Sequence, residues 1–236
     1  MTALAEDQAL KRWVRQLLGH DFKDDALYLT ALTHRSAAAL HNERLEFLGD
    51  AVLNCAVAQM LFESHARADE GDLSRLRASL VSGETLARIA AEHQLGDYLR
   101  LGSGELKSGG FRRASILADA LEALIGAVMV DAGFDAAAAA VRRLVEPRLR
   151  ELPPAETLKD AKTRLQELLQ SQGVALPAYT LVAVQGESHS QVFSVSCEVG
   201  SMHLISSGEG SSRRRAEQLA AERMLALLPA GLKNRA

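Results

Sequence analysis

The sequence of 236 residues lacks the features that mark secreted or membrane-bound proteins. Its N-terminus, MTALAEDQALKRW, has neither the apolar run nor the small-residue cleavage site of a signal peptide. It contains no stretch of about 18 uncharged apolar residues, which a membrane span would need. Of its two cysteines, Cys55 lies in an apolar helical pattern and Cys197 in a strand-like segment, so we expect small core residues rather than a disulfide. A cytoplasmic protein without a membrane segment is therefore expected.

The net charge is also low, and the chain has no overall basic excess that would indicate nucleic acid binding. The formal charge is −3, with 27 Lys+Arg against 30 Asp+Glu. This charge is divided unevenly, because residues 1–152 carry −4 and residues 153–236 carry +1. An acidic first part is compatible with nucleic acid if its carboxylates hold cations. Local patterns, rather than composition, must therefore indicate the function.

The most informative pattern is a set of carboxylates inside an apolar helical segment, His41 to Val57, with the sequence HNERLEFLGDAVLNCAV. Glu43, Glu46 and Asp50 are spaced at i, i+3 and i+7, which places them on one face of a helix. The residues around them leave little polar surface, so we expect a helix that is packed on most sides and continues to about His65. A buried carboxylate needs a proton, a basic partner or a metal ion, since an unpaired one costs several kcal/mol.

A second apolar segment, Ser115 to Val130, contains two ionisable residues, Asp119 and Glu122, again at i and i+3. Two such helices side by side would bring four carboxylates together: Glu46, Asp50, Asp119 and Glu122. A single buried carboxylate is more often a cap or the partner of an arginine, but four at matching spacing favour a metal site. An all-oxygen site suits Mg²⁺ first and Mn²⁺ next, whereas zinc would usually require His or Cys.

These strings resemble the ribonuclease III family. The segment Asn42 to Leu53, NERLEFLGDAVL, is similar to the signature segment of this family, and Asp69 to Leu80 and Leu101 to Gly126 are similar to its companion segments in order and spacing. The similarity extends from about Arg12 to Leu228. It implies an endoribonuclease that cuts double-stranded RNA with Mg²⁺ and without an organic cofactor.

The resemblance also implies roles for individual residues. Asp50 and Glu122 would be catalytic as well as metal-binding. Glu43 and Glu70 would lie at the edge of the site, and Phe47 would contact the second subunit of a homodimer whose two sites each cut one strand. The products would carry 5′-phosphate and 3′-hydroxyl ends with short 3′ overhangs. The substrates would include ribosomal RNA precursors and other structured transcripts.

Helical periodicity runs through most of residues 1–150 and predicts an all-α first domain. The segment Gly102 to Arg113 is rich in glycine and basic residues and is expected to be a loop, without the spacing of a P-loop or a dinucleotide-binding motif. It is either a plain connector or a wall of the substrate channel with Lys107, Arg112 and Arg113 facing phosphates. The other expected helices are Leu4 to Leu18, Asp25 to Leu32, Asp72 to Val81 and Glu84 to His93.

The paired prolines of Glu151 to Leu158 predict a linker between two domains. Residues 159–230 then follow a different pattern, in which a helix, three strand-like runs and a final helix give the order α-β-β-β-α. The expected elements are Asp160 to Gln172, Tyr179 to Val184, Gln191 to Val199, His203 to Ser207 and Ser212 to Leu228. We thus predict an α+β protein with an all-α domain, 1–150, and a small second domain, 159–230, joined by residues 151–158.

The second domain resembles the double-stranded RNA-binding domain, and its last helix begins with a basic run. A helix N-terminus carries free N–H groups, and Arg213, Arg214 and Arg215 add cations that suit phosphates. By the resemblance, the residues that would reach the minor grooves of RNA are Thr163, Gln166 and His189. The sequence departs from the family pattern at Glu217, where a further lysine is often found.

Two other functions fit parts of the sequence. A double-stranded RNA-binding protein without nuclease activity would need the second domain but not the complete set of carboxylates. A di-iron carboxylate bundle would need Glu-x-x-His pairs on facing helices, and the sequence contains none. We therefore predict a Mg²⁺-dependent endoribonuclease.

Overall fold

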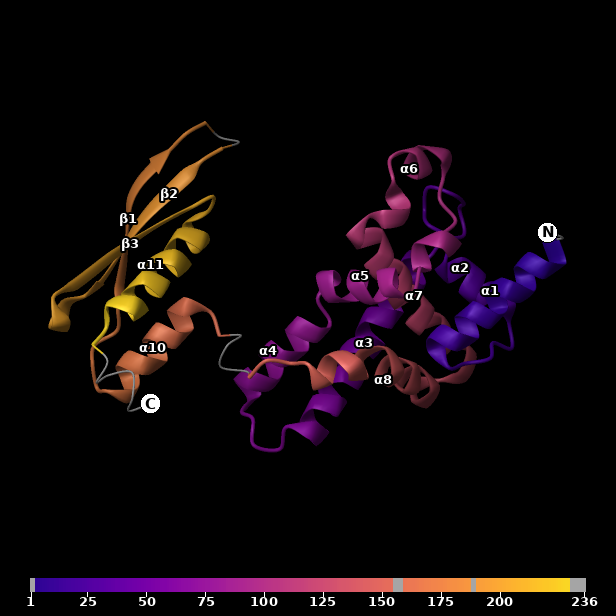
Figure 1. Cartoon of the computed structure of the whole chain (residues 1–236), viewed down its shortest axis with the longest axis horizontal. Helices are drawn as coiled ribbons and strands as arrows, with labels where there is room; N and C mark the ends of the chain where they lie inside the picture. The colour runs from indigo at the N-terminus through magenta and orange to yellow at the C-terminus, as the bar shows by residue number, and fades with distance from the viewer. Residues whose placement is uncertain (1–2, 155–158, 188–189, 230–236) are drawn as a thin grey trace. The chain divides into compact units, whose positions relative to one another are not determined.

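The chain divides into two compact units, Met1–Pro153 and Pro154–Ala236. The computed structural model describes residues 3–154, 159–187 and 190–229 (Figure 1). The first unit is built of helices, and the second combines helices with a three-stranded antiparallel sheet. The predicted fold class, an all-α domain followed by an α-β-β-β-α domain, is confirmed.

Helices joined by short turns make up the first unit. They are α1 (Ala3–Leu18), α2 (Asp25–Ala31), α3 (Glu43–Ser64), α4 (Glu70–Leu80), α5 (Gly83–Glu92), α6 (Ser103–Lys107), α7 (Ala114–Ala132) and α8 (Phe134–Arg150), with 3-10 turns η1 (Leu95–Tyr98) and η2 (Gly110–Arg112). α8 was not among the helices predicted from the sequence. Side-chain caps fix several starts, since the carboxylate of Asp69 accepts from the backbone N–H of Asp72 and the hydroxyl of Ser82 accepts from that of Thr85.

α7 is the central helix of this unit. From Ile116 to Val128, the side chains of every residue except Asp119 and Glu122 are buried. α3, α5, α2 and α8 pack around it. A helix that is apolar on all sides is expected at the centre of a domain, and the two carboxylates are the exception that the site must explain.

Three predictions for this unit are wrong in detail. α3 is packed on one side and exposed on the other, with Phe47 81% exposed and Phe62 73% exposed. Cys55 lies on that outer face and is exposed, so it is not a core residue. The expected loop 102–113 contains α6 and η2, because Gly102 and Gly109 supply the extended and left-handed backbone that start and separate two short helical turns.

Among the helices that the structure describes, α3 alone is long and apolar enough to cross a membrane by length and composition. The core helix of a globular domain meets the same criterion. α3 carries Glu43, Glu46 and Asp50, packs against α7 on one side, and is 39% buried over its most apolar window.

The second unit consists of α10 (Ala161–Ser171), β1 (Ala178–Gln185), β2 (Val192–Val199), η3 (Gly200–Met202), β3 (Leu204–Gly210) and α11 (Arg213–Leu227). The sheet order is β1-β2-β3, with Thr180 opposite Ser196 and Ser196 opposite Ser207. α11 packs against β2 and β3, and α10 packs against α11.

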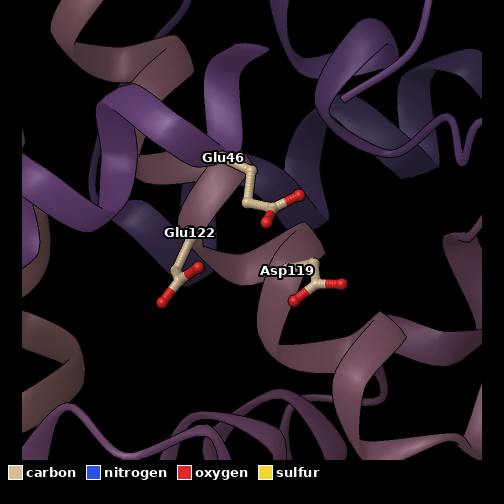
Figure 2. A group of neighbouring side chains, drawn as sticks. All are labelled: Glu46, Asp119 and Glu122. Carbon is tan, nitrogen blue, oxygen red and sulfur yellow. The ribbon is translucent and has the colours of Figure 1, made fainter. Parts of the chain in front are cut away.

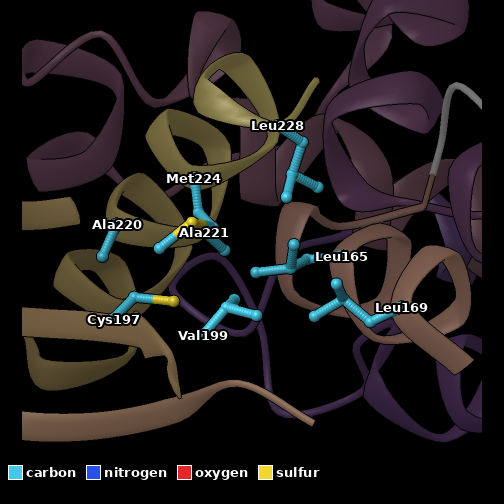
Figure 3. Packing of buried hydrophobic residues seen from close by; sticks show 8 residues of the cluster. All are labelled: Leu165, Leu169, Cys197, Val199, Ala220, Ala221, Met224 and Leu228. Atoms are coloured by element: carbon cyan, nitrogen blue, oxygen red, sulfur yellow. The ribbon is translucent and has the colours of Figure 1, made fainter. Parts of the chain in front are cut away.

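A small apolar core holds the second unit together. Its fully buried members come from both helices and from β2, and include Cys197, whose burial was predicted (Figure 3). Leu165 and Leu169 lie four residues apart on α10, while Val195, Cys197 and Val199 alternate along β2. The helical and strand periods of the sequence therefore point to the same core.

Candidate active site and RNA-binding surface

α3 and α7 cross with their backbones in close contact. A Cβ atom on Gly49 would lie 1.8 Å from the carbonyl oxygen of Glu122, and one on Gly126 would lie 2.1 Å from the carbonyl oxygen of Leu45. Both positions therefore require glycine. This close approach brings the acidic face of α3 next to the two carboxylates of α7.

Three of the four predicted metal ligands meet at this crossing. Glu46 from α3 and Asp119 and Glu122 from α7 each offer one carboxylate oxygen, and these oxygens lie within 4.8 Å of one another (Figure 2). All three side chains are partly buried. An oxygen cluster of this size and composition could hold a hard divalent cation.

Burial and mutual repulsion disfavour the ionised form of the carboxyl groups in the cluster. Burial raises the pKa of Glu122 to about 7, with further contributions from the charges of Asp50, Asp119 and Glu46. Burial also raises the pKa of Glu46, followed by repulsion from Asp119 and Glu43. The unfavourable charge is a reason for the site to bind a cation.

Nearby cations offset only part of this repulsion. Burial raises the pKa of Asp119, while the charges of His34 and Arg35 act in the opposite direction. The net direction for Asp119 is still upward. Within the part of the chain that the structure describes, His34 and Arg35 thus leave the acidic cluster short of positive charge.

Asp50, the fourth predicted ligand, lies at the margin of the cluster. Its side chain is exposed, and its Oδ1 accepts a hydrogen bond of 2.8 Å from Nδ2 of Asn54, one turn along α3. The group of oxygens within 4.8 Å does not include it. Its charge nevertheless contributes to the raised pKa of Glu122, so the two carboxylates are neighbours in the electrostatic sense.

A cavity of about 560 Å³ adjoins the cluster. Glu46 and Asp119 line it together with Glu43, which the sequence predicted at the site edge. His34 also lines it, with Nδ1 2.8 Å from Oγ of Ser36, so it is held by a neighbour in the chain. His41 lies 3.9 Å from Oε2 of Glu43. Neither histidine belongs to the group of possible metal ligands.

Two arginines line the cavity, and the sequence pattern pointed to only one of them. Arg35 forms an ion pair with Glu43, with 3.2 Å between Nη1 and Oε1. Arg113, one of the three basic residues that would face phosphates if the loop forms a wall of the substrate channel, pairs with Glu105 at 3.1 Å. Arg35 lies in the turn that leads to the acidic helix, and this position was the available indication of a role at the site. A turn residue has no periodicity that would indicate where its side chain points.

The other residues predicted near the site do not line this cavity. Glu70 lies in the first turn of α4, is exposed, and accepts a hydrogen bond of 2.8 Å from Oγ of Ser74. Lys107 is exposed at the end of α6. The guanidinium of Arg112 lies 5.0 Å from the centre of the Phe111 ring. A role in binding RNA for these residues stays a prediction.

In the second unit, the predicted RNA-binding residues lie at two helix starts. Thr163 and Gln166 are in the first two turns of α10, where the carboxylate of Asp160 caps the backbone N–H of Thr163 at 2.9 Å. Arg213, Arg214 and Arg215 open α11 and are exposed. His189 lies outside the described residues.

A cavity of about 620 Å³ lies beside the start of α11. Arg214 and Arg215 line it together with Arg164 of α10, a residue to which no sequence pattern pointed. Arg213 instead donates from Nε to Glu217 Oε1 at 2.9 Å. Arg214 and Arg215 therefore face the cavity, whereas Arg213 is paired with Glu217 of the same helix.

Comparison with known proteins identifies both units. The ribonuclease-III-like family matches residues 24–149, and the double-stranded RNA binding motif matches residues 161–228. The chain is 57% identical to ribonuclease 3 of Pseudomonas paraeruginosa over 217 residues, which cover 92% of this chain and 94% of that protein. It is 56% identical to ribonuclease 3 of Ralstonia pickettii over 209 residues, which cover 89% of this chain and 82% of that protein.

A solved structure supports the same family for the first unit. The nuclease domain of ribonuclease III from Campylobacter jejuni superposes with a TM-score of 0.57 at 46% identity, covering 58% of this chain and 97% of that domain. Membership of this family implies the use of a divalent metal ion, and the acidic cluster is a suitable place for it. The chain therefore belongs to the ribonuclease III family and is an endoribonuclease that acts on double-stranded RNA.

Proposed function

We propose that this endoribonuclease uses Mg²⁺, bound by Glu46, Asp119 and Glu122 with Asp50, to hydrolyse phosphodiester bonds into 5′-phosphate and 3′-hydroxyl ends. The observation that carries the proposal is the gathering of three partly buried carboxylate oxygens within 4.8 Å. Mn²⁺ is the expected substitute, because it also prefers oxygen ligands.

The residues fit such a cation. Every donor is a carboxylate oxygen, which suits Mg²⁺. The pKa of Glu46, Asp119 and Glu122 is raised, and a divalent cation would favour their ionised forms. When bound, the ion would supply a water of lowered pKa and stabilise the charge that develops on the leaving oxygen.

The chain contributes position and access. Asp119 and Glu122 lie one turn apart on α7, and Glu46 lies on α3, so the donors are fixed to two rigid helices in close contact. Asp50, oriented by Asn54 and exposed, would complete the set from the solvent side as a catalytic and metal-binding carboxylate. Glu43 and Glu70 are proposed at the edge of the site.

The second unit would hold the RNA duplex. Thr163, Gln166 and His189 are proposed to contact the minor grooves, where 2′-hydroxyls distinguish RNA from DNA. Arg213, Arg214 and Arg215 are proposed to contact phosphates. Their exposure at a helix N-terminus supports this role.

A homodimer is proposed in which each subunit cuts one strand and leaves short 3′ overhangs. Phe47, beside Glu46 on α3 and 81% exposed, is the expected contact across the two-fold axis. The nuclease domain of the Campylobacter jejuni protein has a region involved in dimer formation, which supports this arrangement. Processing of ribosomal RNA precursors and a cytoplasmic location stay predictions.

The test is cleavage of an end-labelled RNA duplex of about 30 base pairs, which exceeds the span of one double-stranded RNA-binding domain. Wild type and Glu122→Gln are compared with Mg²⁺, with Ca²⁺ and with EDTA. Ca²⁺ separates binding from cleavage, because it takes oxygen ligands in a looser geometry than Mg²⁺. We expect cleavage by wild type with Mg²⁺ alone, and binding without cleavage by Glu122→Gln. If both proteins bind and neither cuts with any metal, the chain is an RNA-binding protein on a nuclease fold.

A further inference from the structure

Two ion pairs lie at the cavity beside the carboxylate cluster. Arg35 pairs with Glu43, and Arg113 pairs with Glu105. All four residues line the cavity, together with Glu46 and Asp119. The cavity therefore brings the guanidinium groups of Arg35 and Arg113 close to two proposed metal ligands, Glu46 and Asp119.

The two arginines reach the cavity from separate parts of the chain. Arg35 lies in the turn between α2 and α3, and Arg113 is the residue that precedes α7. The side chain of Arg35 is 69% exposed, and that of Arg113 is 47% exposed. Both guanidinium groups are thus accessible to a molecule that enters the cavity.

The pair of Arg35 with Glu43 is exposed on both sides, at 69% and 49%, and such a pair contributes between about 0 and 1 kcal/mol because water screens both charges. Glu105 is 26% exposed, so its pair with Arg113 is screened less. A phosphate group accepts two parallel hydrogen bonds from a guanidinium, as a carboxylate does, and carries a full negative charge. Phosphate can therefore replace Glu43 as the partner of Arg35 at little cost, and it can join Glu105 at the 47% exposed guanidinium of Arg113.

The electrostatics of the site also call for such contacts. RNA carries a negative charge at each phosphate, and the cluster of Glu46, Asp119 and Glu122 would repel it. Arg35 already acts on this cluster, since its charge opposes the rise in the pKa of Glu46 and of Asp119. A cation at this position can offset the repulsion of a neighbouring phosphate.

We propose that Arg35 and Arg113 bind phosphates of the RNA strand next to the phosphate that is cut, and that Glu43 and Glu105 hold the two guanidinium groups in place until RNA binds. The proposal rests on the proposed function and names the part of the substrate that this cavity takes. It gives Glu43 a role as a positioning residue rather than a metal ligand.

The experiment measures how RNA affinity depends on salt, in Ca²⁺, for Arg35→Gln, Arg113→Gln and the double variant of the full chain. Each lost phosphate contact should reduce the slope of log affinity against log salt by about 0.7 to 0.9. Each single variant should also bind about tenfold less tightly near 0.1 M salt, which corresponds to loss of one charge-assisted hydrogen bond. Arg142→Gln is the matched control, because Arg142 is 51% exposed, pairs with Glu63 and lies outside the cavity.

An unchanged slope in the double variant, equal to that of Arg142→Gln, would overturn the proposal. Arg35→Lys and Arg113→Lys keep the proposal testable if the Gln variants do not fold, since they preserve the charge. The Lys variants should retain the wild-type slope, and a slope reduced as far as in the Gln variants would count against phosphate contacts. A wild type that binds in Ca²⁺ but does not cut in Mg²⁺ would contradict the proposed function and leave this comparison of slopes intact.

Discussion

The ammonium group of Lys162 on α10 lies 2.6 Å from Oε2 of Glu217 on α11. The same carboxylate accepts from Nε of Arg213, and the ammonium of Lys162 lies 4.5 Å from the centre of the Tyr179 ring. Glu217 is 13% exposed. The acidic residue that departs from the family pattern therefore joins the two helices that are proposed to contact RNA.

Replacement of Glu217 should destabilise the second unit. Hydrogen bonds from Lys162 and Arg213 outweigh burial and lower the pKa of Glu217. Because the pKa is lower in the folded state, this stabilisation is present above the ordinary pKa of 4.5 and is lost as the pH falls below it. We expect Glu217→Gln to cost about 1 kcal/mol at neutral pH, and Glu217→Lys to cost more.

Hydrogen exchange of the α11 amides measures this effect within the full chain. Glu222→Gln, an exposed change on the same helix, should leave exchange unchanged. Equal protection of α11 in Glu217→Lys and wild type would show that the ion pair does not stabilise the unit.

Gly49→Ala should damage the fold of the nuclease unit. Its Cβ atom would lie 1.8 Å from the backbone carbonyl oxygen of Glu122, so α3 and α7 would have to move apart. We expect a loss of about 2 kcal/mol or more in the free energy of unfolding, as for overpacked core positions. The single tryptophan, Trp13, lies in this unit, so its fluorescence in urea follows the change.

Gly83→Ala is the control for this substitution, since a Cβ atom there meets nothing within 4 Å. Gly83 is the first residue of α5, and alanine should change stability by no more than about 0.5 kcal/mol. Similar stability of the two variants would contradict the close contact of α3 and α7.

Glu122→Gln should stabilise the metal-free protein at alkaline pH. The pKa of Glu122 is raised to about 7 from an ordinary 4.5. Between these two pH values, the folded protein holds a proton that the unfolded chain has released. Stability contributed by this group is therefore present below the ordinary pKa and lost as the pH rises through about 7. In EDTA near pH 8 we expect the variant to be more stable by roughly 1 to 3 kcal/mol, with no difference near pH 4.

Urea unfolding followed by Trp13 fluorescence also checks this prediction. Addition of Mg²⁺ should favour wild type and reduce or reverse the order, because a cation that binds the folded state stabilises it. Glu151→Gln, an exposed change after α8, should show no such dependence on pH. A wild type that is the more stable protein in EDTA near pH 8 would show that burial of Glu122 is not unfavourable.

Phe47→Ala should weaken self-association without unfolding the subunit. The Phe47 side chain is 81% exposed, so its removal creates no cavity within the chain. We expect the dissociation constant of the dimer to rise at least about tenfold, as for an aromatic anchor of an interface. Sedimentation equilibrium measures this constant, with Leu106→Ala, at a 54% exposed position on α6, as the control. A wild-type protein that is monomeric at micromolar concentration would contradict the proposed dimer.

Periodicity was a good guide to the helices and strands. It predicted α3, α7 and the order of the second unit, because apolar residues at helical and alternating spacing have to face a core. It was a poor guide to which side of α3 is exposed. Phe47 and Cys55 look like core residues in the sequence, but their burial depends on which faces neighbouring helices cover.

The sequence by itself determined the family, the two-unit order and the carboxylates at helical spacing, since these depend on residue type and on distances along the chain. Only the tertiary structure decided that Glu46, Asp119 and Glu122 meet while Asp50 lies at the margin. The pairing of Arg35 with Glu43 and of Lys162 with Glu217 was also decided there. The physical reason is that helix crossings and turns set distances between groups far apart in the chain, and these distances control burial, pKa and ion pairing.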